Sequence, residues 1–464
     1  MNSKSIPNHN AMKPYVLSLL AVLAFSSAAF AQTTPPRRLT IDDAVHIALE
    51  KNSELQSARL DVDRADARVQ EAIGYALPSV DLSGRYTRSL KRPVFFLPDF
   101  ADLSSGRTIP VQIGSNHAVD MTLSARQILF NGTIFVGVGA AGIYADVARD
   151  MFRARQLETV TNVKRAFYRA LLAREAFDLT RTSLTNAENN LKNVNLLRQQ
   201  GVLSEYDELR ATVAVDNIRP MVIQSETNNA LAVESLKNSV GLDPGEEIEI
   251  VGIMQFVPVD DSVMTAAAQT VLDVNPSYAA IQKQVEVNEA FVMAERANYL
   301  PTISAFGNYQ YQSAKNTFNI STNDFFSSSQ VGLQFSMSLF QGLQTNARVQ
   351  QTQVDVRKSQ EQLVSVERNL RIGLTSTIGN LRAARLRIEA QERTVEQAER
   401  GYKIVTARFL SGAATQLEVN DAELALTQAK VNRIQAQYDY LVGSAELDQF
   451  LGRLPSSLPP SDID

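Results

Sequence analysis

The sequence feature that most constrains the fold is a long heptad repeat. The stretch from Ile134 to Gln200 contains no proline, and its glycines lie near its start or just beyond its end. Its apolar residues recur every seven positions, at Val163, Ala170, Phe177, Leu184 and Leu191, and Phe167, Ala187 and Val194 fill the alternate positions. This is the a/d spacing of a coiled coil, which is narrower than the apolar stripe of an ordinary globular helix. At about 1.5 Å per residue the predicted helix spans about 100 Å, which no compact domain needs.

The same apolar seam returns 211 residues later in the chain. The equivalent residues are Leu374, Leu381, Ile388, Val395 and Tyr402. Gly201, at the end of the first long stretch, has its equivalent in Gly412 at the same offset. A constant offset over this distance indicates that one structural unit has been duplicated.

The chain starts with the features of a secretory signal peptide. Lys4 and Lys13 precede an apolar run over residues 16–25, and Ala29-Phe30-Ala31 is a small-x-small cleavage pattern. We therefore predict a signal peptide over residues 1–31, cut after Ala31. The alternative, a retained membrane anchor, is disfavoured because the run is too short to span a bilayer. Loss of the two lysines changes the formal net charge from −5 to −7.

The composition excludes several function classes. The 464-residue chain has no cysteine, which rules out disulfides, thiolate metal sites and cysteine catalysis. His9, His46 and His117 are scattered, and no phosphate loop or metal-ligand cluster is visible. We predict no enzyme, no metal and no cofactor, and the mild acidity argues against a nucleic-acid partner. No run of 18 apolar residues follows residue 31, so no transmembrane helix is predicted.

The first repeat is predicted over residues 32–245. A helix from Ile41 to about Tyr75, capped by Thr40 and interrupted near Asn52-Ser53, ends before Pro78. Strands are expected at about 79–90 and 116–130, separated by a long loop rich in proline and glycine. A long helix over about 134–200 and a return helix over about 204–240 follow. Gly201 ends the long helix, and Ser204 caps the return helix.

The second repeat, over residues 264–452, has the same order. Strands are expected at about 302–313 and 329–341, a long helix at about 344–411 and a return helix at about 415–451. Asn275 matches Asn52, and Leu300-Pro301 matches Leu77-Pro78, both at an offset of 223. Residues 246–263 are expected to form a linker between the repeats, with a short strand near 247–251, and residues 453–464 are expected to form a mobile tail.

The four strands alternate between one apolar and one polar face. In the first strand Val80, Leu82, Gly84 and Tyr86 alternate with residues that include Asp81 and Arg85. One interpretation is two soluble hairpins that cover helices; the other is a wall between lipid and a wet lumen. Glycine and tyrosine on the apolar faces favour the wall. Because four strands cannot close a barrel and open edges are not tolerated in lipid, the chain must then oligomerise. Two copies supply eight strands and a nearly filled interior, and three supply twelve and room for a channel.

The duplicated order of elements, Leu-Pro before the first and third strands, and Leu-Phe-(Asn/Gln)-Gly after the second and fourth resemble the TolC-like outer membrane efflux proteins. Residues 409–423, FLSGAATQLEVNDAE, resemble the family's helical tip motif. The resemblance implies an α+β membrane protein: a homotrimer with a 12-stranded β-barrel continued by a 12-helix α-barrel. It also implies residence in outer membrane lipid, extension into the periplasm, and work with a periplasmic adaptor and an inner membrane transporter.

The resemblance places the functional site at the tips of the helical hairpins. Glu418 and Asp421 match the acidic aperture, and three copies of each would form carboxylate rings that favour cations. Asp207 matches a position that ties the closed aperture. The tip or adaptor contacts are assigned to Asp207, Gly201, Gly412 and Thr415. The alternative is that these acids only stabilise helix N-termini.

Two tip positions depart from the family pattern. Phe409 and Ala414 stand where the well-known closed form has a tyrosine and an arginine as tethers, so a different closed state is expected. The cargo is left open. We expect a passive duct for small toxic compounds or drugs, with a protein-secretion duct as the alternative. A periplasmic or surface coiled-coil structural protein is the alternative of a different class.

Overall fold

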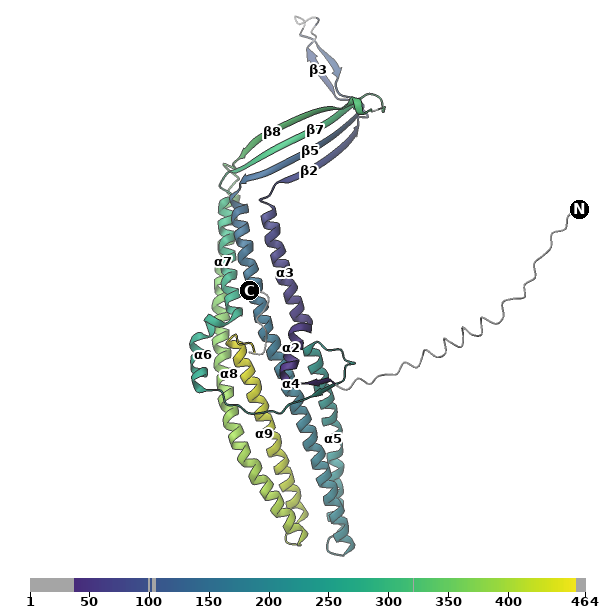
Figure 1. Cartoon of the computed structure of the whole chain (residues 1–464), viewed down its shortest axis with the longest axis vertical. Coiled ribbons are helices and arrows are strands. Elements are labelled where there is room, and N and C mark those ends of the chain that lie inside the picture. Colours follow the sequence, from purple (N-terminus) through teal and green to yellow (C-terminus); the bar gives the residue numbers. More distant parts are fainter. Residues whose placement is uncertain (1–36, 99–100, 102–105, 320, 456–464) are drawn as a thin grey trace, which may run out of the picture.

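The computed structural model describes residues 37–98, 101, 106–319 and 321–455. The predicted signal peptide and residues 456–464 of the predicted tail lie outside this range. The described chain is elongated, with a sheet at one end, helices along its middle and two helical hairpins at the other end (Figure 1). This shape follows from the two long seams, which give the chain its length.

Two long helices form the frame of the molecule. Helix α4 (Gly132–Gln199) and helix α8 (Gln344–Leu410) each pair with a return helix, α5 (Glu205–Val240) and α9 (Gln416–Phe450). The observed bounds differ from the expected ones by one or two residues at most ends. The seam residues Val163, Ala170, Leu374, Leu381 and Ile388 are almost completely buried, as the coiled-coil spacing predicts.

Shorter helices in each repeat complete the helical layer. Helices α2 (Ile41–Lys51) and α3 (Ser53–Gly74) pack on α4, and helices α6 (Asp261–Val274) and α7 (Pro276–Ala297) are their equivalents. Helix α6 begins inside the predicted linker 246–263, so the linker is shorter than expected. Asp260 caps α6 by accepting a hydrogen bond from the Ser262 N–H at 2.9 Å, and this start was missed.

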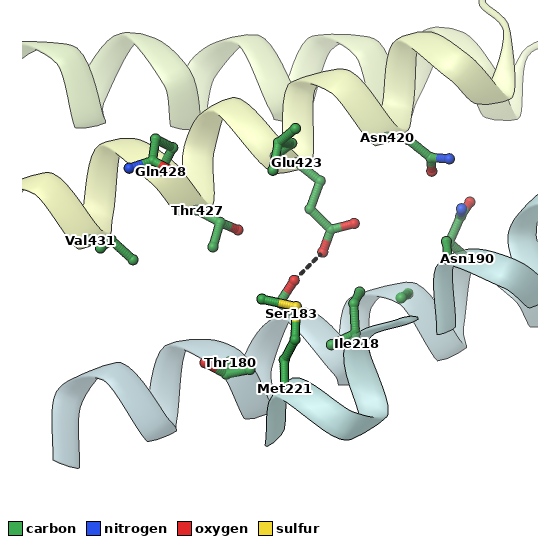
Figure 2. Close-up of a pocket in the computed structure, with 13 residues that line it drawn as sticks. Thr180, Ser183, Asn190, Ile218, Met221, Asn420, Glu423, Thr427, Gln428 and Val431 are labelled. Carbon is green, nitrogen blue, oxygen red and sulfur yellow. Dashed lines mark hydrogen bonds between the residues drawn. The ribbon is translucent and has the colours of Figure 1, made fainter. Parts of the chain in front are cut away.

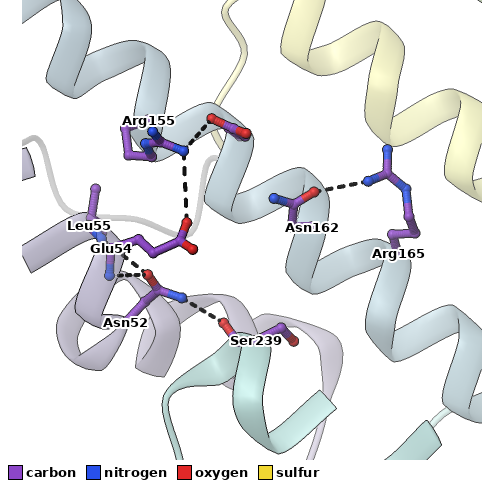
Figure 3. Close-up of polar contacts among 8 residues, drawn as sticks. Asn52, Glu54, Leu55, Arg155, Asn162, Arg165 and Ser239 are labelled. Carbon is purple, nitrogen blue, oxygen red and sulfur yellow. Dashed lines mark hydrogen bonds and ion pairs between the residues drawn. The ribbon is translucent and has the colours of Figure 1, made fainter. Parts of the chain in front are cut away.

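The duplication is visible at single atoms. The side-chain oxygen of Asn52 caps α3, and its amide nitrogen donates to the Ser239 carbonyl in α5 at 2.9 Å (Figure 3). Asn275 caps α7 in the same way and donates to the Phe450 carbonyl in α9 at 3.3 Å. Each asparagine therefore breaks one helix, starts the next and ties both to the end of a return helix.

A four-stranded antiparallel sheet joins the two repeats. Its order is β2 (Ser79–Arg88), β5 (His117–Phe130), β7 (Thr302–Lys315) and β8 (Phe326–Ser336). The register places apolar residues side by side, such as Leu82 beside Leu123 and Leu123 beside Tyr309. The sheet therefore has one face that is mainly apolar. In the described chain the outer edges of β2 and β8 pair with no strand.

The long loop predicted between the first two strands is wrong. Strands β3 (Val94–Pro98) and β4 (Thr108–Gln112) form a separate antiparallel hairpin there. Proline suggested a loop, but a two-stranded hairpin has only edge strands, where a missing N–H is tolerated. The apolar run Val94–Leu97 also hides the alternation that identifies a strand.

The fourth strand is also shifted from its prediction of 329–341. It runs over Phe326–Ser336, so it starts three residues earlier and ends five residues earlier. Ser336 pairs with Thr302, the first residue of β7, and Pro301 precedes it. Beyond Ser336 the chain has no partner strand, although its sequence continues to alternate.

Two short strands form a small sheet beside the middle of the helices. Strand β1 (Arg37–Leu39) pairs in parallel with β6 (Ile248–Ile250), within the predicted short strand near 247–251. Leu39 and Phe167 lie in the large core cluster of this region. Among the described residues, no helix combines the length and apolar character needed to cross a membrane.

Candidate functional site

The first hairpin tip, between α4 and α5, is closed by backbone hydrogen bonds. Gly201 has a φ of 76°, its N–H donates to the Arg198 carbonyl at 2.8 Å, and the Val202 N–H donates to the Leu197 carbonyl at 2.9 Å. This is a Schellman motif, which needs the left-handed conformation that glycine adopts at no cost. Ser204 then caps α5, and the Asp207 carboxylate accepts hydrogen bonds from the Ser204 N–H and hydroxyl.

The second tip, between α8 and α9, repeats this geometry. Gly412 has a φ of 77° and closes the same pair of backbone bonds. Thr415 caps α9, and Glu418 Oε2 accepts hydrogen bonds from the Thr415 N–H at 2.6 Å and from its hydroxyl at 3.0 Å. The bond from the Thr415 N–H, followed by that from its hydroxyl, lowers the pKa of Glu418. Arg408 adds a hydrogen bond to the Ala413 carbonyl at 2.9 Å.

The predicted acids occupy two kinds of position. Asp207 and Glu418 are both third residues of a capping box, so within one chain they perform the helix-capping role that was the alternative interpretation. Asp421 lies one turn further along α9 and is exposed. No hydrogen bond or ion pair joins Asp421 to another residue in the described part of the chain.

Phe409 belongs to the packed interior of the tip. It is 4% exposed and lies in a cluster with Val194, Ala211 and Val419, which come from the other three helices of the hairpin pair. Ala414 packs against the same cluster. The two residues that depart from the family's tether pattern therefore hold the two hairpins together by apolar contact.

A groove of about 310 Å³ lies above the tips, between α4, α5 and α9 (Figure 2). Ile218 and Met221 line its apolar side, and Glu423 faces them from α9. The Ser183 hydroxyl donates to the Glu423 carboxylate at 3.4 Å, which links α4 to α9. Burial raises the pKa of Glu423, against the opposing hydrogen bonds from Ser183 and Asn186.

Sequence reasoning missed Glu423 as a buried carboxylate. It follows the buried residues Gln416 and Val419 at spacings of three and four, so it lies in the phase of the α9 seam. A charged residue in that phase is the signal that could have identified it. The ion pair between Arg198 and Glu208, which joins the end of α4 to the start of α5, was also missed.

An amphipathic four-stranded sheet joined to two long helical hairpins defines a component of an outer membrane channel. The chain belongs to the outer membrane efflux protein family. The sequence model of this family matches residues 44–242 and 267–453. The family and the location in the outer membrane, first expected from the resemblance, are thus confirmed.

Known proteins agree with this assignment. The outer membrane protein TolC of Salmonella enteritidis is 22% identical over 408 residues, covering 87% of this chain and 80% of TolC. The alkaline protease secretion protein AprF of Pseudomonas aeruginosa is 24% identical over 419 residues, covering 89% of this chain and 84% of AprF. These relatives are outer membrane and secretion proteins rather than enzymes.

The fold is also that of a solved structure. The outer membrane protein VceC from Vibrio cholerae superposes with a TM-score of 0.73 at 17% identity, over 89% of this chain and 96% of VceC. The fold class predicted from the sequence, a duplicated helix–strand–strand–helix–helix unit of a TolC-like protein, is confirmed.

Proposed function

We propose that three copies of this chain form the passive outer membrane duct of a tripartite export system. The observation that carries this proposal is the open sheet, whose apolar face is exposed and whose β2 and β8 edges are unpaired in the described chain. Pairing β8 of one copy with β2 of the next removes both edges. Three copies give a 12-stranded barrel, and their hairpins continue it as a 12-helix tunnel.

The position of the tips supports the proposed partners. The sheet and the hairpins lie at opposite ends of the molecule (Figure 1), so in the proposed duct the sheet lies in the outer membrane and the hairpins point away from it. The tip residues Gly201, Asp207, Gly412 and Thr415 are then placed to meet a periplasmic adaptor, which connects the duct to an inner membrane transporter. In this proposal the transporter supplies the energy, and the duct itself needs no catalytic group.

The cargo is proposed to be small toxic compounds or drugs. The alternative is a protein, and the name of AprF, a protease secretion protein, keeps it in view. Two measurements on a deletion strain separate these cargo classes. Increased sensitivity to small toxic compounds supports the first, and loss of a secreted protein supports the second.

The aperture is proposed to be lined by Glu418 and Asp421 from the three chains. Glu418 uses only Oε2 in the capping box, so Oε1 remains available, and Asp421 is exposed. Three-fold symmetry would bring six carboxylates around the axis. Unit charges about 4 Å apart interact by about 4 kcal/mol at an effective dielectric constant of 20, so such a ring recruits cations.

The test is planar-bilayer recording of the wild type and of the Glu418→Gln, Asp421→Asn double variant. The wild type is expected to conduct cations selectively and to be blocked by divalent or trivalent cations from the periplasmic side. The double variant should lose both properties. Glutamine keeps the capping box, so this change removes charge without opening the helix start.

A Thr415→Ala variant is the matched control, because it weakens the cap and leaves both carboxylates. It should lower stability by about 1 kcal/mol and keep the block. Undiminished block in the double variant would show that these residues do not line the constriction.

A further inference from the structure

A row of basic and titratable side chains crosses the end of the sheet that lies away from the helices. In the strand register Arg88 of β2 pairs with His117 of β5, and His117 pairs with Lys315 of β7. Side chains alternate along a strand, so Arg88 shares the apolar face with Tyr86, two residues before it. His117 and Lys315 share that face with Met121 and Tyr311 by the same rule. The row therefore borders the apolar face at its outer end.

The charges of this row are only partly compensated. Lys315 forms an ion pair with Asp324. Arg88 is exposed, as is Lys91 three residues later, and in the described part of the chain neither side chain has an ion-pair partner. Residues 86–98 contain three basic residues and no acidic one. On the opposite face of the same strands the charges are balanced, because Arg85 pairs in register with Asp120.

The imidazole in the middle of the row is held by aromatic neighbours. The Tyr86 hydroxyl lies 2.7 Å from His117 Nδ1, and the two rings stack with centroids 6.1 Å apart. Phe318 packs edge-on against both rings. When the Tyr86 hydroxyl donates to Nδ1, the ring proton is on Nε2, which is then a hydrogen-bond donor even in the neutral imidazole.

The position of the row decides what it meets. Below it lies the exposed apolar face, on which Leu82 is 73% and Val331 is 89% exposed. The helices begin at the other end of the strands (Figure 1). If the sheet is the barrel wall of the proposed function, on which this inference rests, the row lies at the headgroup level of the outer leaflet. Charged side chains cost little at that depth.

We infer that Arg88, His117 and Lys315, together with the exposed Lys91 in the loop after β2, form a lipid-facing site for the phosphate groups of outer-leaflet glycolipids. Arginine matches phosphate geometry with paired N–H donors, and lysine supplies a point charge beside it. Tyr86 and the apolar face below it supply contact for the acyl chains. The site is a collar around the outer end of the barrel, repeated in each copy of the chain.

The experiment is native mass spectrometry of the full-length protein, released from detergent and titrated with purified bis-phosphorylated lipid A. The same titration is made with lipid A whose phosphates have been removed. The wild type is expected to bind the phosphorylated form at least about tenfold more tightly, since each basic residue near a lipid surface contributes about fivefold. The Arg88→Gln, Lys91→Gln variant should lose about 25-fold in affinity for the phosphorylated form on the same estimate.

Arg85→Gln is the control for Arg88, because it removes one positive charge from the same strand on the opposite face. It should change affinity by less than about twofold. Equal binding of both lipid forms by the wild type would overturn the inference, whether or not the variants fold. Equal losses of affinity in the Arg88→Gln, Lys91→Gln variant and in the Arg85→Gln control would overturn it as well.

The same spectra report the number of chains independently. A trimer that shows no preference for the phosphorylated lipid would contradict the proposed phosphate site but not the proposed trimeric duct. Single chains that retain the preference for the phosphorylated lipid would contradict the proposed trimer but not the proposed phosphate site.

Discussion

Glu418 and Asp207 serve the single chain before they serve any assembly, because each carboxylate completes a capping box at a hairpin tip. The charge of each residue and its capping role are therefore separate properties. For four glycines, the backbone conformation and the packing around the residue are also separate properties. Gly201 and Gly412 at the tips, and Gly241 and Gly452 at the ends of the return helices, all have positive φ.

These glycines differ in what surrounds them. A Cβ on Gly241 would lie 2.8 Å from the Lys51 carbonyl oxygen, and one on Gly452 would lie 2.6 Å from the Val274 carbonyl oxygen. A Cβ on Gly201 or Gly412 would meet nothing within 4 Å. The return-helix glycines therefore combine the left-handed conformation with a close backbone approach.

We predict that Gly241→Ala destabilises the protein more than Gly201→Ala. Both changes carry the left-handed penalty of about 1–2 kcal/mol, but only Gly241→Ala also pushes backbone against backbone. Thermal unfolding midpoints of the two variants make the comparison. Equal midpoints would mean that the contact between Gly241 and the end of α2 relaxes without cost.

At the scale of elements, the buried seams decide which helices pack together. Leu381 is 2% exposed and lies against Gly443 of α9, where an added Cβ would meet it at 3.1 Å. Arg382, the next residue, is exposed. At this position the seam therefore joins the long helix α8 to its return helix α9.

Leu381→Asn should lower stability by about 1–3 kcal/mol, because it buries a polar group without a partner. Arg382→Gln, on the exposed side, should have little effect. The temperature at which the assembled protein dissociates in detergent measures both. Similar losses for the two variants would contradict the coiled-coil packing.

The elements could be predicted from sequence where one period dominates. The long helices were located because the seven-residue spacing extends over many turns, and the caps Thr40 and Ser204 were recognised from their residue types. The β3–β4 hairpin was missed because Pro98 and Pro110 argue against strands in general, although edge strands tolerate them. The early end of β8 could not be predicted, because it depends on where its partner β7 begins.

The candidate site was predictable in part. The tip glycines and capping acids follow from local chemistry, which the sequence carries. The contact of Phe409 with both hairpins depends on how the two hairpins pack together, which no local pattern contains. The seam phase of Glu423 is a local signal, but its link to Ser183 depends on how α9 packs beside α4. The row of Arg88, His117 and Lys315 required the register of three strands.

At the scale of the whole molecule, one chain is an incomplete object. Its sheet has an exposed apolar face and, within the described residues, two unpaired edges, and its two hairpins stand side by side at the other end (Figure 1). Covering the edges with further copies of the same chain solves the problem of open strands in lipid. The central claim of the proposed duct is therefore that β8 of one copy pairs with β2 of the next, in a ring of three.

Disulfide cross-linking across that seam tests the claim most directly. The natural chain has no cysteine, so every cross-link comes from the engineered pair. Ser83→Cys in β2 is combined in turn with cysteine at Ser328, Gln330, Gln334 or Ser336, which share the polar face of β8. After oxidation of outer membranes, a ring of three chains should give a ladder of linked chains that ends at three for at least one of these pairs. A ladder that ends at two, or the absence of cross-links at every position, would contradict it.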